Sequence, residues 1–111
     1  MTTIAALAAR LIRVPLTRPW AADVTSVGVI ATHVQRSDGA EGWGFSWTPQ
    51  IGANAVLALL RHDVAPAAVG RSAEPGGAWQ GLWEHLHEAG GGGVTTIALA
   101  GLDLALWDAA A

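Results

Sequence analysis

The first half of the chain shows the alternation of apolar and polar positions that predicts β-strands. Residues 24–36 form the clearest strand, with Val27, Val29 and Ala31 on one face and Ile30, Thr32 and Val34 on the other. The dipeptide Asp38-Gly39 then favours a hairpin turn. We therefore expect residues 43–47 to return as the partner strand.

The N-terminal segment does not have a single interpretation. Residues 1–14 are rich in helix-forming residues, yet their apolar positions also alternate, so helix and strand both stay open. Pro15 and Pro19 are expected to end this segment and to open a loop that continues to residue 23.

From residue 48 onwards the apolar spacing changes to three and four, which predicts three helices. Thr48 is expected to cap the first helix and Pro49 to occupy its first position. Its apolar stripe comprises Ile51, Ala55, Leu59 and Leu60. The second helix carries Trp79, Leu82, Trp83 and Leu86 on one side and is stopped by the glycines of AGGGG.

The third helix is expected to begin after Thr95 or Thr96. Apolar residues surround its whole circumference, which is typical of a buried helix. Strands followed by helices predict an α+β domain, in which a meander of two or three strands precedes a helical bundle. The chain shows no internal repeat and no linker, and its 111 residues suffice for one domain.

Composition narrows the class of protein. An apolar fraction of 51% with only 14% charged residues excludes disorder. The best membrane-span candidate, residues 94–111, carries Asp103 and Asp108, and carboxylates are costly in a span. Arg10 and Arg13 follow the first apolar run and no basic residue precedes it, unlike in a secretory signal. We therefore expect a cytoplasmic protein that contacts no membrane.

Charge and residue usage exclude several kinds of chemistry. The net charge is −3, and the six Arg residues are scattered, so no basic groove for nucleic acid is expected. The absence of Cys excludes disulfides and thiolate metal sites. The absence of Lys excludes Schiff-base and lysine general-base chemistry.

Three short motifs partly match a metal site, a phosphate-binding loop and a nucleophile elbow, but the residues present disfavour each of these functions. In EHLHEAG, His85 and His87 point to different sides of a helix, and Glu84 with His87 would supply only two weak ligands, so a solvated helix face is favoured. GGGGVTT lacks the Gly-Lys-Ser/Thr of a common phosphate-binding loop, which favours a glycine stop. GFSWT lacks the second Gly of a nucleophile elbow around Ser46. No active site is evident in these residues.

Several segments, taken in order, resemble a known family. They are IRVPLTRPW, SDGAEGWGFSWTPQIGANAV, ALLRHDVAPAAVG and LWEHLHEAGGGGVTTIALAGLDLALWDA. Together they resemble the N-terminal domain of the mandelate racemase/muconate lactonizing group of the enolase superfamily, over essentially all 111 residues. GWGFSWTPQIGA and HEAGGGG are most similar to its acid-sugar dehydratase and racemase branch.

The resemblance implies a fold: a three-stranded antiparallel meander followed by a three-helix bundle, with residues 1–14 as a strand. It also implies that residues 1–111 are a capping domain whose C-terminal catalytic barrel is absent from this chain. In relatives the barrel supplies the Lys and His bases and the acidic ligands for Mg²⁺, which stabilises an enediolate formed beside a carboxylate. No catalytic residue and no metal ligand is therefore expected here, and the chain is expected to be an inactive fragment.

The resemblance also assigns substrate-binding positions. The first loop contains Thr17, Arg18 and Trp20, and the second contains Phe45, Trp47 and Thr48. Arg18 would pair with a substrate carboxylate or hydroxyl, and Trp20 and Trp47 would wall the pocket of a small acid sugar. The alternatives are a solvated Arg18 and core packing for each Trp. The implied partners are the missing or separate barrel and, in the full-length form, further copies of the protein.

Two rival functions remain: a stand-alone interaction module that uses an exposed apolar helix face, and a small enzyme built on His85 and His87. The chain ends in AGLDLALWDAAA, whose helix relatives bury between cap and barrel. Four side chains in it are therefore expected to lack cover and to cause self-association: Leu102, Leu104, Leu106 and Trp107.

Overall fold

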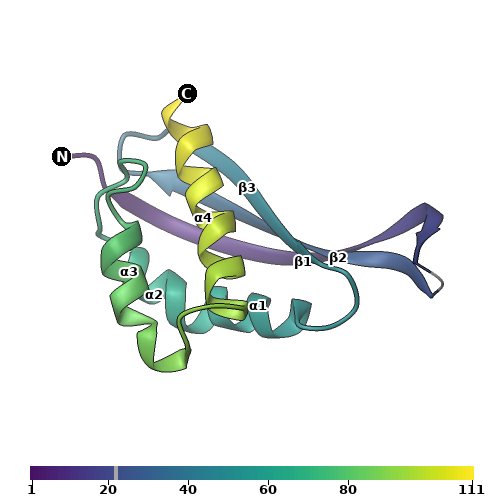
Figure 1. Cartoon of the computed structure of the whole chain (residues 1–111). Coiled ribbons are helices and arrows are strands. Elements are labelled where there is room, and N and C mark those ends of the chain that lie inside the picture. The colour runs from purple at the N-terminus through teal and green to yellow at the C-terminus, as the bar shows by residue number, and fades with distance from the viewer. Residues whose placement is uncertain (22) are drawn as a thin grey trace.

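Three antiparallel strands form the sheet of the computed structural model, which describes residues 1–21 and 23–111. They are β1 (Ile4–Trp20), β2 (Val24–Arg36) and β3 (Glu41–Thr48), in the order β1-β2-β3 (Figure 1). The N-terminal segment, for which the sequence left both helix and strand possible, is thus a strand. Its residues pair with β2, for example Leu11 with Ile30. Pairing within a sheet overrides helix propensity here.

The loop expected after Pro15 is wrong, because β1 continues to Trp20. β1 lies at the edge of the sheet, where a proline without a backbone N–H is tolerated. The pairing with β2 becomes irregular between Pro15 and Trp20, so the prolines disturb the strand without ending it.

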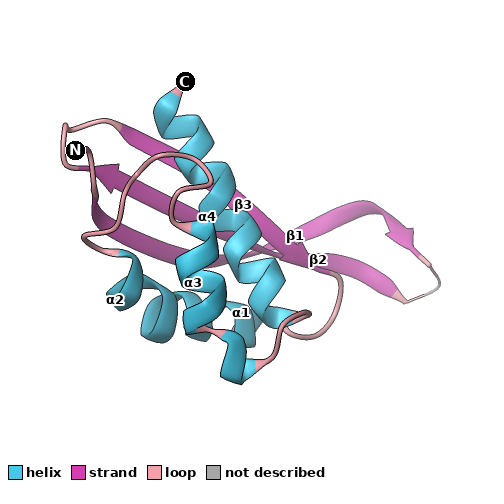
Figure 2. Ribbon diagram, turned by 60° about the vertical axis from the view of Figure 1, so that its left-hand side comes forward, coloured by secondary structure: helices cyan, strands magenta, loops and turns pink. Residues whose placement is uncertain are grey.

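All helices lie in one layer against a single face of the sheet (Figures 1 and 2). They form three consecutive helical segments. The first joins α1 (Ala53–Leu59), the π-helical turn η1 (Leu60–Val64) and α2 (Ala65–Ala68). The second joins α3 (Trp79–His85) and the 3₁₀ turn η2 (His87–Ala89), and the third is α4 (Val94–Ala110).

The start of the first helix differs from the expectation. Thr48 is the last residue of β3, and α1 begins only after Gly52, whose φ of 93° favours glycine. Ile51 and Ala55 are exposed, so the expected apolar stripe is wrong except at Leu60 and the half-buried Leu59. The buried face instead comprises Ala53, Val56, Leu60, Val64 and Ala68. A π-helical turn widens the repeat and keeps positions four apart on one face.

Helix α4 packs closely on the sheet because the facing side of β3 carries only small residues. A Cβ atom added at Gly42 or Gly44 would overlap the backbone carbonyl oxygen of Ala105 or Gly101 in α4. Ser46 and Thr48 continue this buried side of β3. The glycines of EGWGFSWT therefore set the distance between helix and sheet.

Helix α4 is not buried all round, contrary to the expectation. Leu102 and Leu106 belong to the core, where they pack with Leu82 of α3, whereas Leu104 and Trp107 are 46% and 59% exposed. The expectation of four uncovered side chains is thus wrong for Leu102 and Leu106. The three-and-four spacing of Leu99, Leu102 and Leu106 gives one apolar face that this domain covers by itself.

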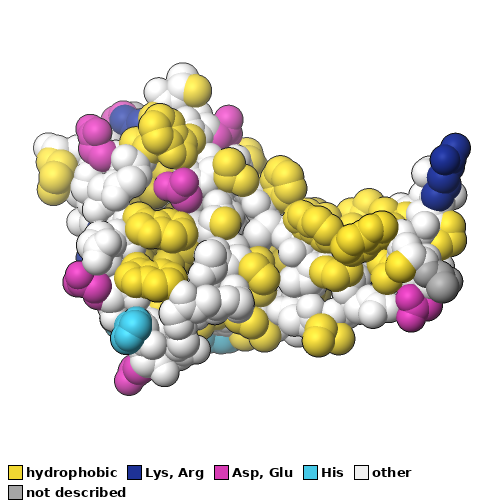
Figure 3. Space-filling model, viewed as in Figure 1, with side chains coloured by type: hydrophobic (Ala, Val, Ile, Leu, Met, Phe, Trp, Pro, Cys, Tyr) yellow, Lys and Arg dark blue, Asp and Glu magenta, His cyan; other side chains and the backbone are white. Residues whose placement is uncertain are grey.

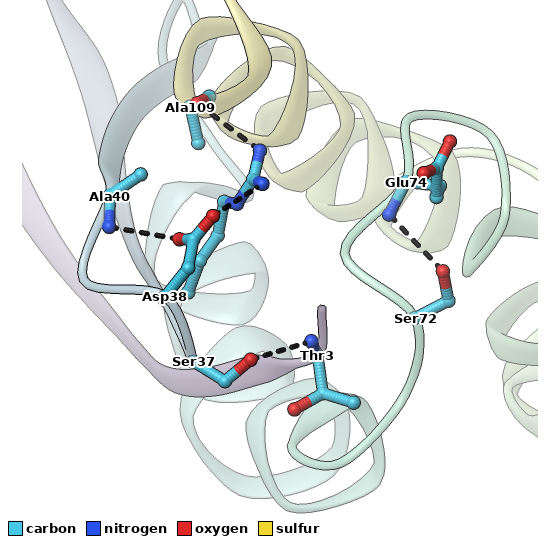
Figure 4. Close-up of polar contacts among 8 residues, drawn as sticks. Thr3, Ser37, Asp38, Ala40, Ser72, Glu74 and Ala109 are labelled. Carbon is cyan, nitrogen blue, oxygen red and sulfur yellow. Dashed lines mark hydrogen bonds and ion pairs between the residues drawn. The ribbon is translucent and has the colours of Figure 1, made fainter. Parts of the chain in front are cut away.

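Polar contacts fasten the C-terminal end of α4 to the β2–β3 turn (Figure 4). Arg36 donates a hydrogen bond to the Ala109 carbonyl oxygen at 3.3 Å and pairs with Asp38 at 2.7 Å. Asp108 of α4 accepts a hydrogen bond from the backbone N–H of Trp43 at 2.8 Å. Within the described residues, no helix is both long and apolar enough to cross a membrane.

Candidate functional site

The C-terminal part of β1 and the N-terminal part of β2 project beyond the helical layer as an arm (Figures 1 and 2). The molecule is accordingly elongated, with a longest extent of 49 Å. Thr17 and Arg18 lie on this arm, and both are exposed. The first of the two loops assigned by resemblance is therefore a part of β1 that stands clear of the domain core.

The sheet face opposite the helices, here called the outer face, carries large apolar side chains. Along β3, Trp43, Phe45 and Trp47 are 58%, 54% and 46% exposed, whereas the residues between them are buried under α4. No helix of the described residues packs on this face. Strand alternation thus separates a glycine-rich buried side from an aromatic exposed side.

Trp20 of the arm contacts Trp47, which lies near the C-terminal end of β3. Their ring centroids are 5.8 Å apart with an interplanar angle of 62°, an edge-to-face contact. With Leu16 and Val27 they line an open hollow of about 290 Å³. Figure 3 shows hydrophobic side chains gathered along this arm, where the surface is concave. We call this the aromatic hollow.

The assigned residues fall into three groups. Phe45 and Trp47 lie on the outer face, and Trp20 contacts Trp47. Thr17 and Arg18 lie nearby on the arm. Thr48 is 4% exposed on the opposite side of β3, where its hydroxyl is buried with no hydrogen-bond partner among the described residues. The structure therefore does not bring Thr48 to the other five.

Two lining residues were missed from the sequence, Leu16 and Val27. A signal for them was present, because Leu16 alternates in phase with Ile12 and Val14, and Val14 pairs with Val27 across the sheet. Because a loop was expected after Pro15, this alternation was not followed as far as Leu16.

The donor set does not fit a metal ion. No group of three or more His, Asp or Glu side chains in residues 1–21 and 23–111 is arranged to hold one. His85 and His87 are exposed at the end of α3 and in η2, and Glu84 accepts a hydrogen bond from Gln80 at 2.9 Å.

Comparison with known proteins gives a consistent family. The family model described as mandelate racemase / muconate lactonizing enzyme, N-terminal domain, matches residues 5–111. A curated 3,6-anhydro-alpha-L-galactonate cycloisomerase from Streptomyces coelicolor is 38% identical over 81 residues, which cover 72% of this chain and 22% of that protein.

Two solved structures are similar over nearly the whole chain. A racemase from Streptomyces coelicolor A3(2) with bound magnesium has 31% identity and a TM-score of 0.89, covering 96% of this chain and 31% of that one. L-Talarate dehydratase from Polaromonas sp. JS666, complexed with Mg and L-glucarate, has 25% identity and a TM-score of 0.91, covering 100% and 32%. The chain thus spans between 22% and 32% of the length of these relatives.

Proposed function

The chain belongs to the mandelate racemase/muconate lactonizing enzyme N-terminal domain family of the enolase superfamily, and from this premise we propose that it is the substrate-capping domain of a magnesium-dependent acid-sugar dehydratase or racemase. The similar proteins support the substrate class: one acts on a galactonate derivative, and another was solved with L-glucarate. The proposed reaction begins with removal of a proton from the carbon beside a carboxylate.

The contact between Trp20 and Trp47 carries this proposal. It joins the two segments that the resemblance assigns to substrate, and both indoles are about half exposed, which argues against a purely structural core role. In the full-length enzyme the aromatic hollow would exclude water and contact the C–H face of the sugar acid. Arg18, on the same arm, would pair with a carboxylate or hydroxyl of the substrate.

The chemical step belongs to residues outside this chain. The chain has no Lys, and its described carboxylates and imidazoles do not gather into a metal site. A catalytic barrel would supply the bases and hold Mg²⁺, as the bound magnesium in two of the similar structures suggests. We therefore propose that the chain is inactive alone, that its partner is this barrel, and that the full-length protein is a homo-oligomer.

A chimera tests the proposal. Residues 1–111 replace the N-terminal domain of the Streptomyces coelicolor cycloisomerase, which is 38% identical over the matched region. The chimera should convert 3,6-anhydro-alpha-L-galactonate, whereas the chain alone and the barrel alone should not. A folded chimera with no activity above the barrel alone would overturn the capping role.

The second candidate is an interaction module, which the exposed aromatic row of the outer face favours: Trp43, Phe45 and Trp47. The nucleotide sequence after Ala111 distinguishes the two. A continuing or shifted frame that encodes a Lys-x-Lys strand followed by spaced acidic residues supports the cap, and its absence supports the module.

A further inference from the structure

A second hollow opens on the outer face, away from the arm. Its volume is about 270 Å³, and it is lined by Ala8, Ala9, Arg10, Ala31, His33, Trp43 and Arg61. It shares no lining residue with the aromatic hollow. Trp43 and Trp47 are four positions apart on β3, so the two hollows are separated by about 13 Å along the strand.

Two arginines, Arg10 and Arg61, line this hollow. Arg10 lies on the outer face, where it pairs across the sheet with Ala31. Arg61 comes from η1 in the helical layer and reaches the free edge of β1, where its Nε donates a hydrogen bond to the Ala9 carbonyl oxygen at 3.1 Å. This bond holds the Arg61 side chain in place, and among residues 1–21 and 23–111 its two terminal nitrogens have no hydrogen-bond partner.

No acidic side chain balances these two charges. None of the lining residues is Asp or Glu, and within the described part of the chain neither Arg10 nor Arg61 forms an ion pair. On the same face, Glu41 is paired with the lining residue His33, whose Nε2 lies 3.3 Å from the Glu41 carboxylate. Two cations that share one hollow repel each other, and an anion between them removes that cost.

The rest of the lining is apolar and shaped by small residues. Ala8 and Ala31 are cross-sheet neighbours of His33 and Arg10, and their short side chains leave a depression between bulkier groups. The His33 ring lies 4.4 Å from the Trp43 ring, which positions the indole as one wall. The hollow therefore combines an anion-binding edge with an apolar floor and an aromatic side.

We propose that this hollow binds a small organic carboxylate with a flat apolar body. The carboxylate lies between the guanidinium groups of Arg10 and Arg61, whose forked donors match its two oxygens. The body lies over Ala8 and Ala31 against Trp43. The apolar floor favours such a ligand over an inorganic anion. This proposal does not depend on a catalytic barrel, so it can be tested independently of the proposed function.

The test is a titration of the ¹⁵N-labelled 111-residue chain, followed by NMR at a concentration where sedimentation shows a monomer. The probe is benzoate at constant ionic strength, with acetate and inorganic phosphate as comparison arms. Benzoate should give saturable shifts at residues 8–10, residues 31–33 and the Trp43 indole N–H, and should bind at least tenfold more tightly than acetate or phosphate.

Variants make the test specific. Arg10→Gln and Arg61→Gln should each weaken benzoate binding at least tenfold while the remaining spectrum stays native. Arg13→Gln is the matched control, because this exposed arginine lies on the same strand but on the opposite face, beside Gly28, and it should bind as the wild type does. Arg10→Lys keeps the positive charge but lacks the paired N–H donors of a guanidinium group. It replaces Arg10→Gln if that variant fails to fold, and it should also bind benzoate more weakly than the wild type.

Three results would overturn the proposal. They are shifts that never saturate, benzoate affinity unchanged in both glutamine variants, and phosphate binding as tight as benzoate. The last result would leave an inorganic anion site without selection for an organic body.

Discussion

Asp38 connects a tight turn to the far end of the last helix. Its carboxylate accepts a hydrogen bond from the Ala40 backbone N–H at 3.1 Å and pairs with Arg36 at 2.7 Å. These contacts, the Ala40 N–H first and the Arg36 guanidinium after it, hold the pKa of Asp38 below its ordinary value. Arg36 in turn donates to the Ala109 carbonyl oxygen at the C-terminal end of α4, where a cation is favoured.

A pH dependence of stability follows at this residue. A carboxyl group whose pKa is lowered by folding stabilises the fold above its unfolded pKa, and that contribution is lost as the pH falls through the folded pKa. Wild type should therefore melt at a higher temperature than Asp38→Asn at pH 7, and the gap should shrink below about pH 4. Thermal melts from pH 7 to pH 2.5 measure this, with Asp63→Asn as the control for losing one negative charge. A gap that stays constant with pH would contradict the account.

At the scale of elements, the closest packing is between α4 and β3. The pattern of hydrophobic residues predicted β2, the hairpin after it and the α4 segment, because alternation and turn chemistry are local properties. It did not predict that α1 starts at Ala53. Thr48 and Pro49 have the residue types of a helix start, but Thr48 is the last residue of β3. It also failed to show that one side of α4 is exposed, because periodicity cannot tell which neighbours a helix will have.

The candidate site was predictable only in part, for a similar reason. The resemblance assigned Trp20 and Trp47, and no local pattern implies that positions 27 residues apart come into contact. Strand parity alone could have separated Thr48 from Phe45 and Trp47, because neighbouring positions on a strand face opposite sides. The second hollow depends on an Arg61 side chain that crosses from the helical layer to the edge of β1, which is a tertiary contact.

Replacing Gly44 by Ala tests the packing of α4. The new methyl group would overlap the Gly101 carbonyl oxygen, which is backbone and cannot move aside without shifting the helix. We expect a loss of about 3 kcal/mol in the free energy of unfolding, measured by urea denaturation. Gly92→Ala is the matched control, since nothing lies within 4 Å of its added Cβ, and it should change stability little. Equal stability of both variants would show that α4 does not need the glycine.

At the scale of the whole molecule, the domain covers its own core but leaves the outer face bare. Leu102 and Leu106 are buried without help from another domain. The exposed large apolar side chains of the outer face and arm are Ile12, Val14, Trp20, Trp43, Phe45 and Trp47. On α4, by contrast, Leu104 and Trp107 are flanked in the sequence by Asp103 and Asp108. A contiguous apolar face of this kind is uncommon on a monomer.

We therefore expect the isolated chain to associate with itself as its concentration rises, mainly through the outer face. Sedimentation across a concentration series measures this, together with binding of a hydrophobic dye. Phe45→Thr/Trp47→Thr should weaken association more than Leu104→Ser/Trp107→Ser, because it removes part of the contiguous aromatic row. A wild-type chain that stays monomeric and binds no dye, or a larger effect of the α4 pair, would contradict this expectation.

The central claim is that the arm and the outer face contact substrate when a barrel is present. The most direct measurement is the KM of the chimera for its sugar-acid substrate in Arg18→Ala and Trp47→Ala, with Trp83→Ala as a control on the helical layer. Losing a hydrogen bond to a charged group costs about 1.5–3 kcal/mol, so KM should rise tenfold or more for Arg18→Ala, and Trp47→Ala should raise it through loss of the hollow. The Trp83 variant should keep the parent KM. Unchanged KM values in both site variants, with folding intact, would contradict the account.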